Sequence, residues 1–151
     1  MVITLYTQEL LNDLRSKSHY EVSQIENVEV RYRAEAGSEK TDEIKRCISD
    51  GIARLRHRCW RFLREEITET NDNGTYWTDE SVFDLSLSEL RAINKSEPLT
   101  VAMHTFVVEY ALSKFYSDMS MQDLSNKHSV LAMEAGDRID DMLFTKMPPR
   151  V

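Results

Sequence analysis

Glycine is scarce in this sequence, with four residues in 151, and proline and cysteine are rarer still, with three and two. Loops that cradle phosphates or dinucleotides need closely spaced glycines, and neither a Walker-type nor a dinucleotide pattern occurs. The GxSxG and HExxH patterns of hydrolases are also absent. The sequence therefore predicts no catalytic residue, no cofactor and a protein that is not an enzyme.

The two cysteines do not suggest a disulfide or a metal site. Cys47 and Cys59 are twelve residues apart, which on one helix separates them by roughly 18 Å, far beyond disulfide reach. Neither CxxC nor HxxxH occurs, so no metal-binding residue is predicted. We expect both cysteines to be small buried apolar residues.

A long apolar run is missing too. None approaches the roughly 18 residues that span a bilayer, and the N-terminal MVITLYTQELL lacks the basic start and apolar stretch of a signal peptide. We therefore expect a chain made in a cytoplasm, with no membrane partner. Its length suits a single domain.

The net charge of −7 argues against a strongly basic nucleic-acid domain, yet the charges are segregated. Residues 44–64 hold seven basic side chains and one acid, and residues 65–90 hold eight acids and no base. Such blocks favour either head-to-tail contact between copies or neutralisation within the chain. The candidate acidic partner surface consists of Glu65, Glu66, Glu69, Asp72, Asp79 and Glu80.

The spacing of apolar residues predicts the elements of the N-terminal half. A first short helix contains Tyr6, Leu10 and Leu14. Residues 28–33 alternate apolar and charged side chains, which is typical of a half-exposed strand, although a loop or extended arm fits as well. A long amphipathic helix is predicted over residues 39–66.

Most arginines fall opposite the apolar face of that long helix. Arg54, Arg58, Arg61 and Arg64 form a ridge, while Arg56 projects among apolar positions, where it must snorkel or pair with a carboxylate. The ridge is either a solvated helix face or a charge-only contact for DNA, an acidic protein or a neighbouring subunit. Aromatic residues do not interleave with it, so sequence-specific recognition is not predicted.

Residues 70–80 are predicted to form a loop or hairpin around Asn73-Gly74. Residues 82–87 alternate again, so a small sheet is expected from segments near 28–33, 75–78 and 82–87.

Two helices are predicted in the C-terminal part. Ser96-Glu97-Pro98 is a helix-start signal, and the helix over 99–117 is apolar nearly all round, as in the centre of a domain or an assembly. Its core or assembly residues are Met103, Phe106, Val107, Tyr110 and Phe115. A final amphipathic helix runs from Ser120 to about Phe144.

Two histidines, His104 and His128, fall on apolar faces of these last helices. They could meet in the core. We interpret them as structural residues, because no acid nearby in the sequence completes a site.

These patterns together predict a mainly α fold, a helical bundle of about four helices, two or three of them long, with a small β-hairpin or short-strand element. A single domain covers residues 1–151. It comprises an N-terminal helix and extended segment (1–37), a long helix (38–67), a loop with short strands (68–95), and two C-terminal helices with a tail (96–151).

The C-terminal half resembles a known family. The FDLSLS segment, the helix EPLTVAMHTFVVEYALSKFYS, a polar break and a closing helix before MPPR are similar to head–tail connector, or adaptor, proteins of tailed phages and prophages of Bacteroides-type hosts. The resemblance spans residues 83–150. It implies a non-enzymatic virion protein, assembled in the host cytoplasm, that forms a ring, typically of twelve copies, at the head–tail interface.

Such a ring lies below the portal protein, extends the DNA channel and docks tail proteins, and DNA passes through it without specific contacts. A subunit with unlike contact surfaces on its two sides closes such a ring when its rotation permits. Two alternatives are another tail-completion or neck protein and a cytoplasmic regulatory adaptor. The regulatory adaptor would bind an acidic protein or nucleic acid through the arginine ridge.

Overall fold

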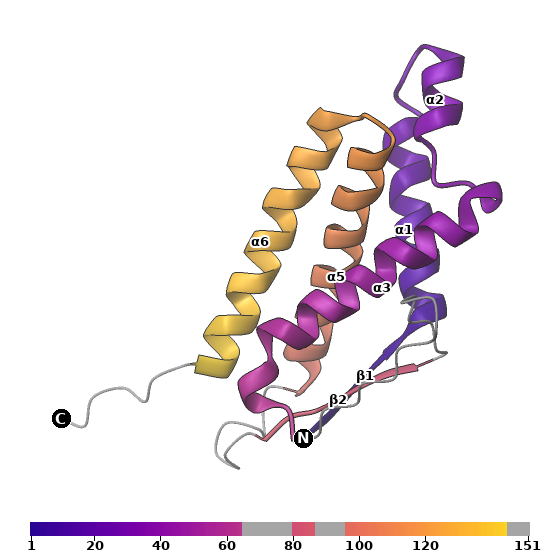
Figure 1. Ribbon diagram of the computed structural model, residues 1–151. Helices are drawn as coiled ribbons and strands as arrows, with labels where there is room; N and C mark the ends of the chain where they lie inside the picture. The colour runs from indigo at the N-terminus through magenta and orange to yellow at the C-terminus, as the bar shows by residue number, and fades with distance from the viewer. Residues whose placement is uncertain (65–79, 87–95, 145–151) are drawn as a thin grey trace.

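The computed structural model describes residues 1–64, 80–86 and 96–144 (Figure 1). Within these ranges the chain forms five α-helices and one two-stranded sheet, which confirms a mainly α bundle with a small β element. The elements, in order, are β1 (Val2–Tyr6), α1 (Thr7–Val22), α2 (Val28–Ala34), η1 (Ser38–Lys40), α3 (Thr41–Arg58), η2 (Trp60–Phe62), β2 (Glu80–Asp84), α5 (Ser96–Asp118) and α6 (Gln122–Phe144).

Helix α5 lies at the centre of the bundle because its apolar residues face every direction. It packs against α6, α3, α1 and β1, and Figure 1 shows it alongside α6. Met103, Val107 and Phe115 are fully buried and Phe106 is nearly so, whereas Tyr110 is half-buried. Elements of the same chain therefore cover most of this apolar helix.

The sheet joins two segments that are distant in the sequence. Strands β1 and β2 pair antiparallel, with Ile3 opposite Phe83. Ile3, Leu5 and Phe83 face the core, while Val2 and Tyr6 face outward. Residues 82–87 were predicted to form a strand, and β2 confirms its existence at 80–84. Strand β1 was missed, since Tyr6 was placed in the first helix, although VITLY has the β-branched alternation of a strand.

The prediction of a strand or extended arm at 28–33 is wrong, because these residues form helix α2. The Asn27 side chain accepts hydrogen bonds from the backbone N–H groups of Glu29 and Val30, so it caps the helix. Glu29 also adds an acid to the first turn. The alternation was too short to distinguish a strand from a two-turn helix. The other predicted strand, 75–78, lies outside the described residues.

The long helix is shorter than predicted, since α3 ends at Arg58 instead of continuing to residue 66. After it, the chain makes the η2 turn and then pairs with the end of β2. The Arg64 N–H donates to the Asp84 carbonyl, the Ser86 N–H donates to the Phe62 carbonyl, and Leu63 bridges Leu85. Tertiary pairing has therefore overridden the local helical periodicity.

The two C-terminal helices are found where they were predicted, with α5 beginning at Ser96.

Cys47 and Cys59 are buried and free, and burial raises the pKa of each thiol to about 12, so neither is a reactive thiolate at neutral pH. Among the described residues, none of the helices combines the length and apolar character that a membrane crossing needs.

We predict that Phe106→Ala lowers the free energy of unfolding by about 3–5 kcal/mol, because it empties a ring-sized volume in the core. Val101→Ala, on the exposed side of the same helix, should change it by less than about 0.5 kcal/mol. Urea unfolding followed by circular dichroism measures both. A cost below about 1 kcal/mol for Phe106→Ala would show that this ring is not central to the core.

Candidate functional site

The predicted arginine ridge does not form one helix face. Arg54 is exposed on α3, but Arg58 turns toward α6, where its Nε lies 3.0 Å from Asp140 Oδ1 and its Nη2 lies 2.8 Å from Oδ2. Arg61 lies in η2 beside the Trp60 ring and Arg64 follows it, both beyond the end of α3. The helix stops too early to align the four side chains.

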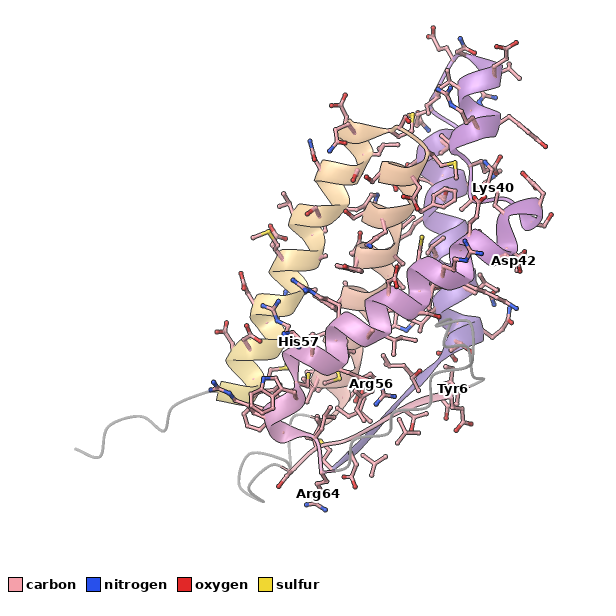
Figure 2. All side chains as sticks on the ribbon, in the orientation of Figure 1. Tyr6, Lys40, Asp42, Arg56, His57 and Arg64 are labelled. Carbon is pink, nitrogen blue, oxygen red and sulfur yellow. The ribbon has the colours of Figure 1, made fainter. Side chains whose placement is uncertain are left out.

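Arg56 was expected to snorkel or to pair. Its guanidinium lies over the Phe83 ring, 4.7 Å from the centroid, in a cation–π contact with β2. Figure 2 shows Arg56 and His57 on α3 and Arg64 beyond the end of that helix.

Little of the candidate acidic surface can be placed. Glu80 is exposed at the start of β2. Glu65, Glu66, Glu69, Asp72 and Asp79 lie outside the described residues.

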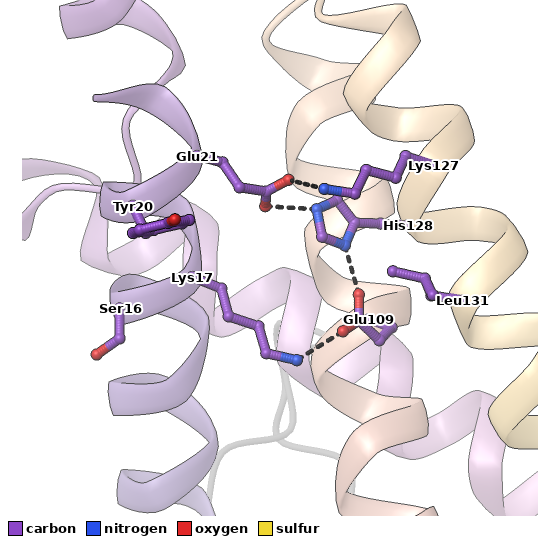
Figure 3. Close-up of a pocket in the computed structure, with 8 residues that line it drawn as sticks. All are labelled: Ser16, Lys17, Tyr20, Glu21, Glu109, Lys127, His128 and Leu131. Atoms are coloured by element: carbon purple, nitrogen blue, oxygen red, sulfur yellow. Dashed lines mark hydrogen bonds and ion pairs between the residues drawn. The ribbon is translucent and has the colours of Figure 1, made fainter. Parts of the chain in front are cut away.

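The structure instead brings together a cluster of charged side chains from three helices (Figure 3). We call the side chains of Lys17, Glu21, Glu109, Lys127 and His128 the charge cluster. Both ring nitrogens of His128 on α6 contact carboxylates: Nδ1 contacts Glu109 Oε2 on α5, and Nε2 lies 2.6 Å from Glu21 Oε1 on α1. The His128 and Glu109 side chains are only 3% and 5% exposed, so this contact is a core interaction.

Two lysines complete the charge cluster at its ends. Lys17 Nζ donates to Glu109 Oε1 over 2.6 Å, and Lys127 Nζ donates to Glu21 Oε2 over 2.9 Å. The sequence of contacts is therefore Lys17, Glu109, His128, Glu21 and Lys127, and all four carboxylate oxygens have a partner. Tyr116 lies beside the imidazole, with ring centroids 5.5 Å apart.

Helix α1 contributes to these contacts at a regular interval. Asp13, Lys17 and Glu21 are four residues apart and thus lie along one side of the helix. Asp13 Oδ2 lies 2.5 Å from His104 Nε2 on α5, Lys17 pairs with Glu109, and Glu21 reaches α6. This stripe borders the buried face formed by Leu10, Leu14 and Val22, so α1 is held by apolar contact and, beside it, by ion pairs.

The contacts of His128 restrict its chemistry. Two ionised carboxylates can only accept, so a ring that bonds both of them donates from both nitrogens and carries a positive charge. Such a ring has no lone pair with which to remove a proton from a substrate. The geometry is therefore that of a structural link between helices, in which the imidazole is already fully occupied.

Electrostatics support an ionised Glu109. Burial alone would raise the pKa of this carboxyl, but the hydrogen bonds from His128 and Lys17 and their positive charges outweigh it, so the pKa is lowered. Burial raises the pKa of the neighbouring Tyr116, with the Glu21 and Glu109 charges acting in the same direction. Tyr116 is thus a neutral wall of the cluster at physiological pH.

A pocket of about 410 Å³ opens beside the charge cluster, between α1 and α6. Ser16, Lys17 and Tyr20 line it from α1, and Lys127, His128 and Leu131 line it from α6 (Figure 3). Within the described residues, no group of three histidine, cysteine, aspartate or glutamate side chains has the arrangement of a metal site.

Sequence reasoning found His128 but missed its partners. His104 and His128 could have met in the core, but His104 pairs with Asp13 and His128 with two glutamates. The acids are 19 and 107 residues away in the sequence, so a search for nearby acids could not find them. One signal was available: Glu109 is an acid within a helix that is otherwise apolar over most of its surface.

Comparison with known proteins gives no identification: no protein-family model, curated protein or solved structure matches this chain.

Removing the imidazole tests the structural role of the cluster. We predict that His128→Leu lowers the free energy of unfolding by about 3–5 kcal/mol, because it removes the cation that Glu109 and Glu21 share and leaves one oxygen of each carboxylate without that donor. His104→Leu, which removes a histidine from a more exposed pair, should cost at most about 1 kcal/mol. Urea unfolding at pH 7 measures both, and equal costs would contradict the assigned importance of His128.

The lowered pKa of Glu109 predicts a pH dependence. The native carboxylate contributes stability above its unfolded pKa of about 4.5, and this contribution is lost as the pH falls through the lower native value. The stability difference between wild type and Glu109→Gln should therefore shrink below about pH 4.5. Urea unfolding from pH 7 to pH 3 tests this, with the exposed Glu134→Gln on α6 as control. A difference that stays constant with pH would contradict the assignment.

Proposed function

We propose that this chain is a non-enzymatic virion structural protein, a head–tail connector that forms a ring below the portal, extends the DNA channel and docks the tail. The proposal starts from the resemblance of residues 83–150 to phage connector proteins. The structure supports it through the distribution of exposed apolar side chains, which suits contact between unlike surfaces of neighbouring copies.

The observation that carries the proposal is the surface of helix α2, which projects at the end of the bundle opposite the sheet (Figure 1). Val28 and Tyr32 are one helical turn apart on α2 and are 70% and 67% exposed. We call this pair the tip patch. Exposed apolar side chains that share a face are typical of protein contact sites.

Helix α2 is held firmly although it is short and projects. Lys40 Nζ donates to the carbonyls of Tyr32, Arg33 and Glu35, which satisfies the C-terminal end of the helix. The Ala36 N–H donates to the buried Ser18 hydroxyl of α1 over 2.9 Å. The tip patch is therefore presented in a fixed orientation, which lowers the entropy lost on binding.

The opposite end of the molecule also exposes apolar side chains. Val2 and Tyr6 face outward from β1, and Trp60 is exposed in η2. Helix α1 connects β1 to the α2 end, and its 16 residues span roughly 24 Å. Two unlike apolar surfaces separated in this way favour heterologous contact, which generates rings when the rotation between copies closes.

The charge of the chain is compatible with DNA passage. A connector channel must let DNA slide, so attractive contacts with phosphates have to be weak. The chain carries a net charge of −7. Arg58, one of the four candidate arginines, is neutralised by Asp140. The broken ridge also removes the main support for a regulatory adaptor that binds nucleic acid through these four arginines.

Light scattering of the chain, alone and mixed with a purified phage portal protein, tests the proposal. We expect a ring-sized species or a stable complex with the portal. Val28→Glu combined with Tyr32→Glu should abolish that species while leaving the circular dichroism spectrum unchanged. Val130→Glu, an exposed apolar position on α6, should retain it.

Three results would count against the proposal. A wild-type chain that remains monomeric at high concentration and ignores the portal would contradict a connector. Binding to tail proteins without ring formation would favour a tail-completion protein instead. Unchanged assembly of the double variant would show that the tip patch is not a subunit contact.

A further inference from the structure

The pocket between α1 and α6 has more hydrogen-bond donors than its own acceptors use. The four oxygens of Glu21 and Glu109 are already occupied by Lys17, Lys127 and His128. Each lysine ammonium has three N–H donors and uses one of them on these carboxylates. The remaining N–H groups are accessible, because the Lys17 and Lys127 side chains are 45% and 57% exposed.

The charge balance of the pocket also favours a ligand that accepts hydrogen bonds and carries a negative charge. When His128 donates from both nitrogens, the charge cluster contains three positive groups and two negative ones, which leaves a net charge of +1. The chain as a whole is strongly acidic, so this pocket is a local exception. A single negative charge is the complement that the cluster lacks.

The walls of the pocket favour a ligand that also has an apolar part. Leu131 on α6 and the Tyr20 ring on α1 line it beside the lysines (Figure 3). The volume of about 410 Å³ lies within the range of small-molecule sites, which combine apolar walls with a few placed polar groups. A bare inorganic anion would leave these walls without contact.

We propose that this pocket binds a carboxylate carried on a short apolar stem. The carboxylate accepts hydrogen bonds from the remaining N–H groups of Lys17, the Lys127 ammonium at the other end of the charge cluster adds positive charge, and the stem packs against Tyr20 and Leu131. Glu21 and Glu109 hold the two ammonium groups in place, and buried His128 fixes both glutamates, so the donors are positioned before the ligand arrives. The ligand is a small organic acid or the acidic side chain of another copy.

This site does not depend on ring formation, so the proposal stands or fails independently of the connector function. The probe is butyrate, titrated into the ¹⁵N-labelled full chain and followed by NMR. We expect saturable shifts of backbone amides in residues 16–21 and 127–131. Affinity should rise roughly ten-fold from acetate to butyrate, because two methylenes are buried, and neutral butyramide should produce no saturable shift.

Two variants test the location of the site. Leu131→Trp fills the pocket without removing a charge and should abolish the butyrate shifts, whereas Val130→Trp, at the exposed neighbouring position, should keep them. Lys17→Met should weaken butyrate binding at least ten-fold. Lys114→Met, which removes a lysine paired with Asp50, should leave the affinity unchanged. If Lys17→Met fails to fold, the comparison of Leu131→Trp with Val130→Trp still shows whether butyrate binds in this pocket.

Several results would overturn the proposal: no saturable shift with butyrate, equal shifts with butyramide, undiminished binding in Leu131→Trp, or tighter binding of inorganic phosphate than of butyrate.

Light scattering then identifies the source of the carboxylate. If butyrate binds and lowers the mass of an assembled species, the natural ligand is an acidic side chain of a neighbouring copy. If butyrate binds and the mass is unchanged, the natural ligand is a free acid.

Discussion

The arrangement of this molecule depends on the contact of His128 with two glutamates from different helices. Glu109 and His128 belong to α5 and α6, which pack along their length, but Glu21 comes from α1 on the other side of the pocket. One imidazole thus connects three helices. Because one of its two hydrogen bonds is buried and the other is partly buried, a displacement of α1 weakens the contact between Glu21 and the imidazole in a region with little water to replace it. The contact therefore specifies where α1 lies as well as adding stability.

The position of α1 in turn determines both ends of the molecule. Its first residue follows β1 directly, and α2 follows its last turn after a short connection. Ser18 on α1 accepts the hydrogen bond from Ala36, and His19 contacts Glu35 over 2.6 Å. The projecting α2 and the sheet are thus oriented by the same helix. The two surfaces proposed as subunit contacts are thereby held at a fixed separation.

The sequence predicted the helical class and the two C-terminal helices because their periodicity is long and regular. It failed where the deciding contacts are tertiary. Residues 62–64 left the helical pattern because they pair with residues 84–86, and Asn27 converted a short alternation into a capped helix. The charge cluster was beyond prediction for the same reason. A histidine can be assigned to a core face from spacing, but its partners come from distant segments that only the fold brings together.

The Arg58 guanidinium, which reaches Asp140, lies over Gly136 of α6, where a β-carbon would come within 2.5 Å of the guanidinium carbon. Glycine inside a helix lowers the stability of that helix. At position 136, however, the absence of a side chain leaves room for Arg58 to cross α6. The Arg58 side chain of α3 thus occupies the space that a side chain at residue 136 of α6 would fill. A larger side chain at residue 136 would displace the guanidinium and leave Asp137 and Asp140 without the arginine that both contact.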